Sequence, residues 1–291
     1  MKNTVISLSI LLIIIFSACQ NIEKKTLTSG EAQTLLTEAV TAFSIYSKTQ
    51  EDATKAAFES ENTLKSAETN TDEYPVITID PFNLTEWPKT ITIDYGPENH
   101  LGIDGRYRRG VMLIKAHNFA EIENTVWEIT FSDYYQNDHK VEGTQTIKYT
   151  GLNTSNNPEY ECSIIDGVIT TPAGKLFYFE QDTKREWIYG HDTHYVTTGN
   201  IEDLCDDEYL ISGTHSGVSS DGYTYTMSAL NDPLHVNVCC KYVMEGILSV
   251  SLPDNNLSCE IDYRPDSDVG DMCNSEAAFT IFGITYPITL N

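Results

Sequence analysis

The sequence predicts an all-β protein of antiparallel meanders, in a sandwich or an extended sheet, with a short N-terminal helical tether. Apolar and polar residues alternate at several places after Tyr74, and the clearest examples are residues 90–95, 127–131, 248–252 and 286–290. Such alternation indicates strands with one face toward a core and the other toward water. Turns that contain Gly separate the strands, at residues 103–105, 172–174, 220–222 and 281–283. Asp-Gly between alternating segments is a strong hairpin signal.

The segment before the strands has a different composition and favours a helix. Apolar residues follow a helical spacing, so residues 31–48 form an amphipathic helix in this prediction: Leu35, Leu36, Ala39, Val40, Phe43 and Tyr46. The apolar face becomes thin after Lys48, and sustained heptads are absent. We therefore expect residues 19–73 to be a lipidated N-terminus and a helical or flexible tether before a β-rich domain at 74–291.

A weak internal repeat divides that domain. Val141-Glu142-Gly143-Thr144 leads to a strand with Cys162, and Met244-Glu245-Gly246-Ile247 leads to a strand with Cys259. The repeat predicts two duplicated halves, at about 74–200 and 201–291. The alternative is a chance similarity between β sequences of biased composition.

The first residues indicate export. A short basic start precedes an apolar run from Val5 to Phe16, which is too short for a stable membrane anchor, and Ser17-Ala18-Cys19 follows. These residues resemble a bacterial lipobox, with Phe16 where Leu is usual. The resemblance implies that residues 1–18 are a signal peptide and that Cys19 carries lipid, palmitate included, at the outer membrane. The alternative is an ordinary signal peptide cut after Ala18, with Cys19 a plain thiol.

The charge balance narrows the range of partners. The chain has 18 basic and 43 acidic residues and a net charge of −25. A surface of this kind repels phosphate backbones, so we expect no nucleic-acid partner. It also repels anionic lipid head groups, so attachment to a membrane depends on lipid at Cys19.

Six cysteines remain after Cys19, and in an exported protein they favour disulfides: Cys162, Cys205, Cys239, Cys240, Cys259 and Cys273. Six cysteines allow 15 connectivities, among which the sequence does not decide. The rival is a zinc site. No CxxC pair occurs, and adjacent Cys239 and Cys240 alternate faces in a strand, which suits two different bridges better than one metal.

Two places have spacing that a metal site could use. His191 and His194 could share a metal with Asp192 or Asp182 as an oxygen ligand, although the context favours a hairpin loop with solvated His side chains. Four acids crowd one loop and could bind calcium: Asp262, Asp266, Asp268 and Asp271. Gly270 stands where an EF-hand needs an oxygen ligand, so that motif is rejected. Ordinary solvation is the favoured interpretation of both clusters, and no cofactor is expected.

No catalytic motif is complete. Residues 213–217 superficially match a GxSxG elbow, but His215 occupies the central position and no helix follows. Arg106, Arg108 and Arg109 could receive a carboxylate or phosphate, but pairing with neighbouring acids is favoured. The 17 Tyr could form a sugar-stacking face, although Tyr is also a common strand residue.

A set of short blocks resembles uncharacterised β-rich outer-membrane lipoproteins of Bacteroidota. The blocks cover most of 87–291: Thr90-Ile91-Thr92-Ile93-Asp94-Tyr95-Gly96, Asp104-Gly105-Arg106-Tyr107-Arg108-Arg109-Gly110, Lys140-Val141-Glu142-Gly143-Thr144, Cys239-Cys240-Lys241-Tyr242-Val243, and Cys273 followed by Tyr286-Pro287-Ile288-Thr289-Leu290. The chain departs from the pattern by lacking a Cys near Gly96 and by carrying Lys241-Tyr242 where Arg-Trp is usual. The resemblance implies an exported β-rich lipoprotein with a Cys240–Cys273 bridge, and it implies no reaction.

These observations predict a lipid-anchored cell-envelope protein with a non-catalytic binding or structural role. Its expected partners are the membrane, through the N-terminal lipid, and a glycan or an envelope protein. The alternative is a carbohydrate-active hydrolase that uses a carboxylate pair. The sequence leaves open which pair of acids that would be, and whether the protein is an enzyme at all.

Overall fold

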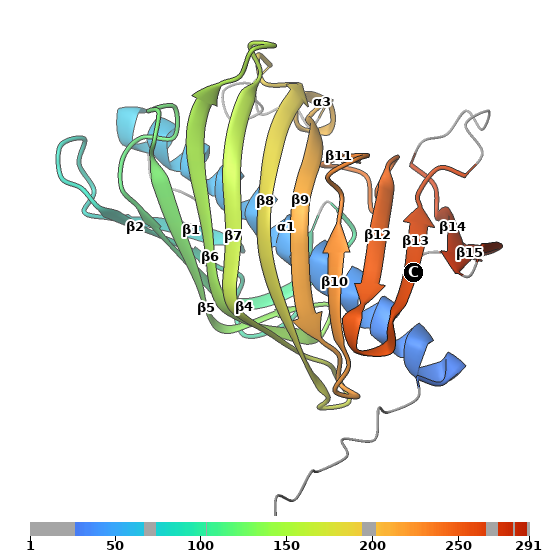
Figure 1. Cartoon of the computed structure of the whole chain (residues 1–291). Helices are drawn as coiled ribbons and strands as arrows, with labels where there is room; N and C mark the ends of the chain where they lie inside the picture. The colour runs from blue at the N-terminus through green and yellow to red at the C-terminus, as the bar shows by residue number, and fades with distance from the viewer. Residues whose placement is uncertain are drawn as a thin grey trace, which may run out of the picture.

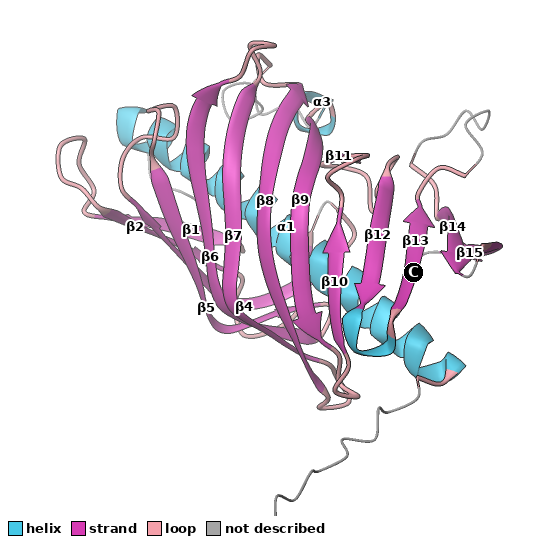
Figure 2. Ribbon diagram, viewed as in Figure 1, coloured by secondary structure: helices cyan, strands magenta, loops and turns pink. Residues whose placement is uncertain are grey.

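The fold is one curved antiparallel sheet around one long helix (Figure 1). A computed structural model describes residues 27–66, 74–102, 104–193, 202–265, 273–281 and 283–289. Figure 2 shows how strands dominate the described chain. The all-β prediction is therefore confirmed, and the single sheet corresponds to the extended-sheet alternative.

Neighbours in the sheet are mostly neighbours in the sequence, in the order β1-β2-β4-β5-β6-β7-β8-β9-β10-β12-β13-β14-β15, with β3 beside β4 and β11 beside β9. The first strands are β1 (Val76–Asp80), β2 (Lys89–Asp94), β3 (His100–Leu101), β4 (Tyr107–Ala116), β5 (Val126–Gln136), β6 (His139–Leu152), β7 (Pro158–Thr170) and β8 (Leu176–Tyr189). The others are β9 (Glu208–Val218), β10 (Thr224–Ser228), β11 (Leu234–Asn237), β12 (Ile247–Leu252), β13 (Leu257–Asp262), β14 (Glu276–Ile281) and β15 (Ile284–Thr289). A short helix α3 (Glu202–Cys205) precedes β9, and a 3-10 turn (Pro253–Asn255) precedes β13.

The predicted strands and hairpins match this topology. The four segments of clearest alternation are β2, β5, β12 and β15, and the turns at 172–174 and 220–222 join β7 to β8 and β9 to β10. The sheet runs without interruption across the boundary between the two proposed halves. Strands β8 and β9 flank that boundary and pair from Tyr178↔Val218 to Tyr189↔Glu208.

Both glycines of the repeated Glu-Gly pair occupy positions where a side chain would not fit. Gly143 has φ +117° and Gly246 has φ +114°, a region that side chains rarely adopt. A Cβ at Gly143 would lie 2.8 Å from the carbonyl oxygen of Asp166, and at Gly246 2.4 Å from that of Pro233. The pairing register shifts beside Gly143, as in a β-bulge, which bends a strand and increases its twist. The Glu-Gly repeat therefore marks two positions that both require the positive φ that glycine adopts readily.

The helix α1 (Ser29–Ser66) is longer than predicted. A capping box fixes its start, because the Thr28 amide donates to the Glu31 carboxylate while the Glu31 amide donates to the Thr28 hydroxyl. Its 38 residues extend about 57 Å. No helix among the described residues has the length and apolar composition needed to cross a membrane.

The predicted N-terminal helix is confirmed, but α1 is not a tether apart from the β-rich domain, because this helix belongs to the core. Figure 1 shows α1 running diagonally along the concave side of the sheet. Leu35, Ala39, Phe43 and Tyr46 are buried there, and the Tyr46 ring stacks on Phe179 of β8 with ring centroids 5.5 Å apart.

The middle of α1 consists of polar residues that are buried on every side of the helix. Five consecutive residues, from Ser47 to Glu51, are each no more than 9% exposed. Thr49 donates to Gln145 of β6 at 2.8 Å, and Glu51 pairs with Arg185 of β8. These partners compensate the cost of burying polar groups, and they explain why the apolar face appears thin in the sequence.

Candidate ligand-binding cavity

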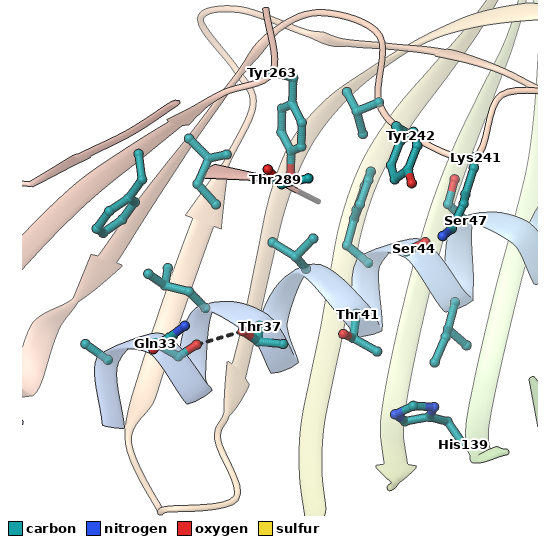
Figure 3. Close-up of a pocket in the computed structure, with 18 of the residues that line it drawn as sticks. Gln33, Thr37, Thr41, Ser44, Ser47, His139, Lys241, Tyr242, Tyr263 and Thr289 are labelled. Atoms are coloured by element: carbon teal, nitrogen blue, oxygen red, sulfur yellow. Dashed lines mark hydrogen bonds between the residues drawn. The ribbon is translucent and has the colours of Figure 1, made fainter. Parts of the chain in front are cut away.

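A cavity of about 1300 Å³ lies between the N-terminal half of α1 and the last strands of the sheet. Figure 3 shows part of its lining, with α1 across the centre. One wall is α1 as far as Lys48, together with Leu27 and Thr28 just before the helix, and the facing wall is formed by strands β13–β15 and the loop after β11. Residues near the β4 start and the β5–β6 hairpin complete the lining: Arg106, Gln136, Asn137 and His139.

The helix presents two parallel stripes to the cavity. The polar stripe follows successive turns and consists of Gln33, Thr37, Thr41, Ser44 and Lys48. The apolar stripe beside it consists of Leu36, Val40 and Phe43. Spacings of three and four residues place side chains on one face of a helix, so the local sequence determines both stripes. Exposure falls along the polar stripe, from exposed Gln33 and Thr37 to buried Lys48, which marks the deep end.

The facing wall is chiefly apolar. Alternation along β13 and β14 places four apolar side chains toward α1: Leu257, Ile261, Phe279 and Ile281. Tyr242 and Val243 add to this wall from the loop between β11 and β12.

Two disulfides fix that loop at adjacent residues. Cys239 is bonded to Cys205 at the end of α3, and Cys240 is bonded to Cys273 before β14. Adjacent cysteines thus enter two different bridges, as their alternation predicted, and the Cys240–Cys273 pair is the one that the family resemblance implied. The bridges hold Lys241, Tyr242 and Val243 against the cavity.

Cys162 and Cys259 are free thiols, so their prediction as disulfide partners is wrong. They lie on β7 and β13, which are five strand spacings of about 4.8 Å apart in the sheet order. A disulfide needs Cα atoms within about 7 Å. Both thiols are buried, and burial raises the pKa of Cys162 to about 12 and that of Cys259 to about 11.

Basic side chains gather at the deep end of the cavity. Arg106 donates through Nη2 to the Ser44 hydroxyl at 2.9 Å and to the Lys241 carbonyl oxygen at 3.2 Å. Lys48 Nζ donates to Glu51 at 2.7 Å and to the carbonyl oxygen of Val238 at 3.0 Å. Burial lowers the pKa of Lys48, and the Glu51 charge opposes that shift.

The predicted pairing of the arginine cluster with acids is confirmed. Arg108 holds both oxygens of Asp104, Arg109 pairs with Asp138, and Arg106 Nη1 lies 3.3 Å from Asp104. Burial raises the pKa of Asp104, but the hydrogen bonds and charge of Arg108 outweigh it and hold that pKa well below its usual range. The sequence did not reveal that Arg106 also reaches a cavity.

The predicted metal ligands lie away from this cavity or outside the described residues. His191 follows β8 and contacts Asp192 at 3.0 Å, and Asp262 at the end of β13 accepts a hydrogen bond from the Arg264 amide. His194, Asp266, Asp268 and Asp271 lie outside the described residues. Within the residues that the structure describes, no three His, Cys, Asp or Glu side chains form a metal-binding group.

His215 is part of the aromatic core, which agrees with the rejection of a nucleophile elbow. It is 2% exposed and packs between Phe43 and Phe179, with ring centroids 5.3 and 5.4 Å away. Burial lowers its pKa to about 3.

Comparisons with protein-family models, curated proteins and solved structures found no match to this chain.

The cavity lining differs sharply in charge from the chain as a whole. Acids account for 43 of the 291 residues, but none of the described residues that line the cavity is Asp or Glu. A hydrolase that uses two carboxylates would need acids at its substrate. The described cavity wall therefore offers that mechanism no support, and its hydroxyl, amide and apolar groups are suited to binding.

Proposed function

We propose that this protein is a non-catalytic binding protein of the cell envelope whose ligand places an apolar chain in the cavity between α1 and β13–β15. The observation that carries the proposal is the cavity itself. Its volume of about 1300 Å³ exceeds the roughly 300–1,000 Å³ of pockets for drug-sized ligands.

The shape of the lining favours an extended ligand over a compact one. The stripe from Gln33 to Lys48 extends about 22 Å along α1. Leu36 and Val40 line it from the helix, and Ile261 and Phe279 line it from the sheet. Burying apolar ligand surface on such a wall contributes roughly 25 cal/mol per Å² before the costs of association.

The same proposal places the protein on a membrane through lipid at Cys19. Its support is the lipobox-like Ser17-Ala18-Cys19 after a short apolar run. Cys19→Ser should release the chain from the membrane fraction into the soluble envelope fraction. A Cys19→Ser chain that sediments with membranes as the parent does would contradict the anchor.

Uptake of a neutral fluorescent dye such as Nile red tests the cavity directly. The full chain with Cys19→Ser is the right material, because no lipid attached at residue 19 can then fill the cavity. We expect saturable enhancement of fluorescence. Val40→Trp should abolish it by filling the space between α1 and the sheet.

A matched substitution controls for folding and for non-specific dye binding. Ile165 is 57% exposed, is not among the cavity residues, and should bind dye normally as Ile165→Trp. Circular dichroism would confirm that both variants are folded. Dye uptake that Val40→Trp leaves unchanged, or binding of a soluble glycan without any dye uptake, would overturn the proposed function.

A further inference from the structure

The absence of acids from the described lining bears on the charge of the ligand. In a chain with net charge −25, the charged side chains in the described part of the lining are Lys48, Arg106 and Lys241. A negative ligand meets no carboxylate on the described wall, whereas a positive ligand would meet three cations there. Charge complementarity of this kind determines selectivity.

Two of the three cations already have partners behind the wall. Lys48 pairs with Glu51 at 2.7 Å, and Arg106 lies 3.3 Å from Asp104. Neither Glu51 nor Asp104 lines the cavity. Both cations are therefore already engaged, although their acids are shared: Asp104 also binds Arg108, and Glu51 also pairs with Arg185.

Lys241 is the cation that remains. Its side chain is exposed, its Nζ lies 5.2 Å from the centre of the Tyr242 ring, and no described carboxylate lies within ion-pair distance of it. Figure 3 shows Lys241 extending from its loop toward the turn of α1 that carries Ser44 and Ser47. The hydrogen bonds of Arg106 to Ser44 and to the Lys241 carbonyl oxygen join these residues at one end of the cavity.

We propose that the ligand is a long-chain carboxylate whose head group binds Lys241 and the neighbouring hydroxyl of Ser44, with its chain along Leu36, Val40 and Phe279. The Lys241 ammonium, which pairs with no carboxylate among the described residues, balances one negative charge. A phosphate monoester carries about 1.5 to 2 negative charges at neutral pH, which is more than the Lys241 ammonium alone balances. This inference rests on the proposed function, because both use the same cavity.

Displacement of the neutral dye by ligands of equal chain length tests the head group. The probes are dodecanoate, dodecanol, dodecyl phosphate and dodecylamine, each below its micelle-forming concentration and added to the full chain with Cys19→Ser. We expect dodecanoate to displace dye at a concentration at least about tenfold lower than dodecanol. Dodecyl phosphate should lie between them, and dodecylamine should be the weakest.

Lys241→Ala should remove the advantage of dodecanoate and leave dodecanol unchanged, and Lys241→Glu should reverse the preference. Lys175→Ala is the matched control, because Lys175 is an exposed lysine on the β7–β8 turn outside the cavity. Equal displacement by dodecanoate and dodecanol would overturn this inference while the proposed function stands. An advantage that survives Lys241→Ala would overturn the role of Lys241, and failure of every chain to displace dye would overturn the proposed function itself.

Discussion

Arg108 holds both carboxylate oxygens of Asp104, with Nη1–Oδ1 and Nη2–Oδ2 distances of 2.8 Å each. Its Nε also lies 2.8 Å from Asp52 on α1, so one guanidinium joins the start of β4 to the helix that the sheet surrounds. Glu51, the residue before Asp52, pairs with Arg185 of β8 on another part of the sheet. Ion pairs on two sides of the helix therefore fix α1 inside the sheet.

Arg108→Met should lower the free energy of unfolding by about 3–5 kcal/mol, because it leaves buried carboxylates without their main partner. Urea denaturation followed by circular dichroism measures the change. Arg109→Met is the matched control, since its pair with Asp138 is solvent-exposed and should contribute little to stability. Equal effects of the two substitutions would contradict the structural role of Arg108.

His215→Phe should reduce the loss of stability in acid. The pKa of buried His215 is about 3, against about 6.5 in an unfolded chain, so the unfolded state binds the proton first. The free energy of unfolding of the parent is therefore unaffected by His215 above about pH 6.5, and it declines as the pH falls from 6.5 toward 3. Between pH 7 and pH 4.5, the parent should lose about 2–3 kcal/mol more than His215→Phe.

Urea denaturation at both pH values tests this difference. His117→Phe provides the comparison, because the His117 side chain is 40% exposed. If the parent and His215→Phe showed the same acid sensitivity, His215 would not be buried in the neutral form.

Removal of the Cys240–Cys273 bridge should affect both stability and the cavity. The bridge closes a loop with a sequence separation of 33, and a loop of that length corresponds to about 3–4 kcal/mol. The double variant Cys240→Ser/Cys273→Ser should therefore unfold at lower urea concentration. It should also bind Nile red more weakly, because Lys241, Tyr242 and Val243 lose their attachment.

The second bridge supplies a comparison for stability. Cys205→Ser/Cys239→Ser opens a closed loop of similar length, with a separation of 34, and should lower stability by a similar amount. A Cys240→Ser/Cys273→Ser protein as stable as its parent would show that this bridge does not constrain the fold.

Gly110→Ala should be among the most damaging small substitutions in the sheet. Gly110 has φ +86°, and a Cβ there would lie 1.9 Å from the carbonyl oxygen of Asp133 on β5. We expect the free energy of unfolding to fall by more than about 3 kcal/mol, since strain at positive φ adds to displacement of the neighbouring strand. The drop in melting temperature relative to the parent tests this expectation.

Gly174→Ala isolates the contribution of backbone strain. Gly174 has φ +78° in the β7–β8 turn, and no atom lies within 4 Å of its Cβ position. Gly174→Ala should therefore lower the free energy of unfolding by about 1–2 kcal/mol. Similar costs at positions 110 and 174 would contradict the close approach of β4 and β5.

Local patterns were sufficient to predict the strands, the hairpin turns and the first part of the helix. Alternation in β2, β5, β12 and β15 requires only that one face of each strand be buried, and Asp221-Gly222 determines a turn within a few residues. The expectation of export, together with alternation at Cys239 and Cys240, similarly sufficed to predict two separate bridges at that pair.

The tertiary structure alone decided where α1 lies and what surrounds the cavity. Lys48, Gln50 and Glu51 lie in the sequence where the apolar face becomes thin, and they are buried because strands far away in the chain supply partners such as Arg185. Thr37, Thr41 and Ser44 have helical spacing that identifies one face of α1, but their role as a cavity wall depends on β13–β15, more than 200 residues later. The physical reason is that spacing determines which side chains share a face, whereas the pairing of distant strands determines what that face meets.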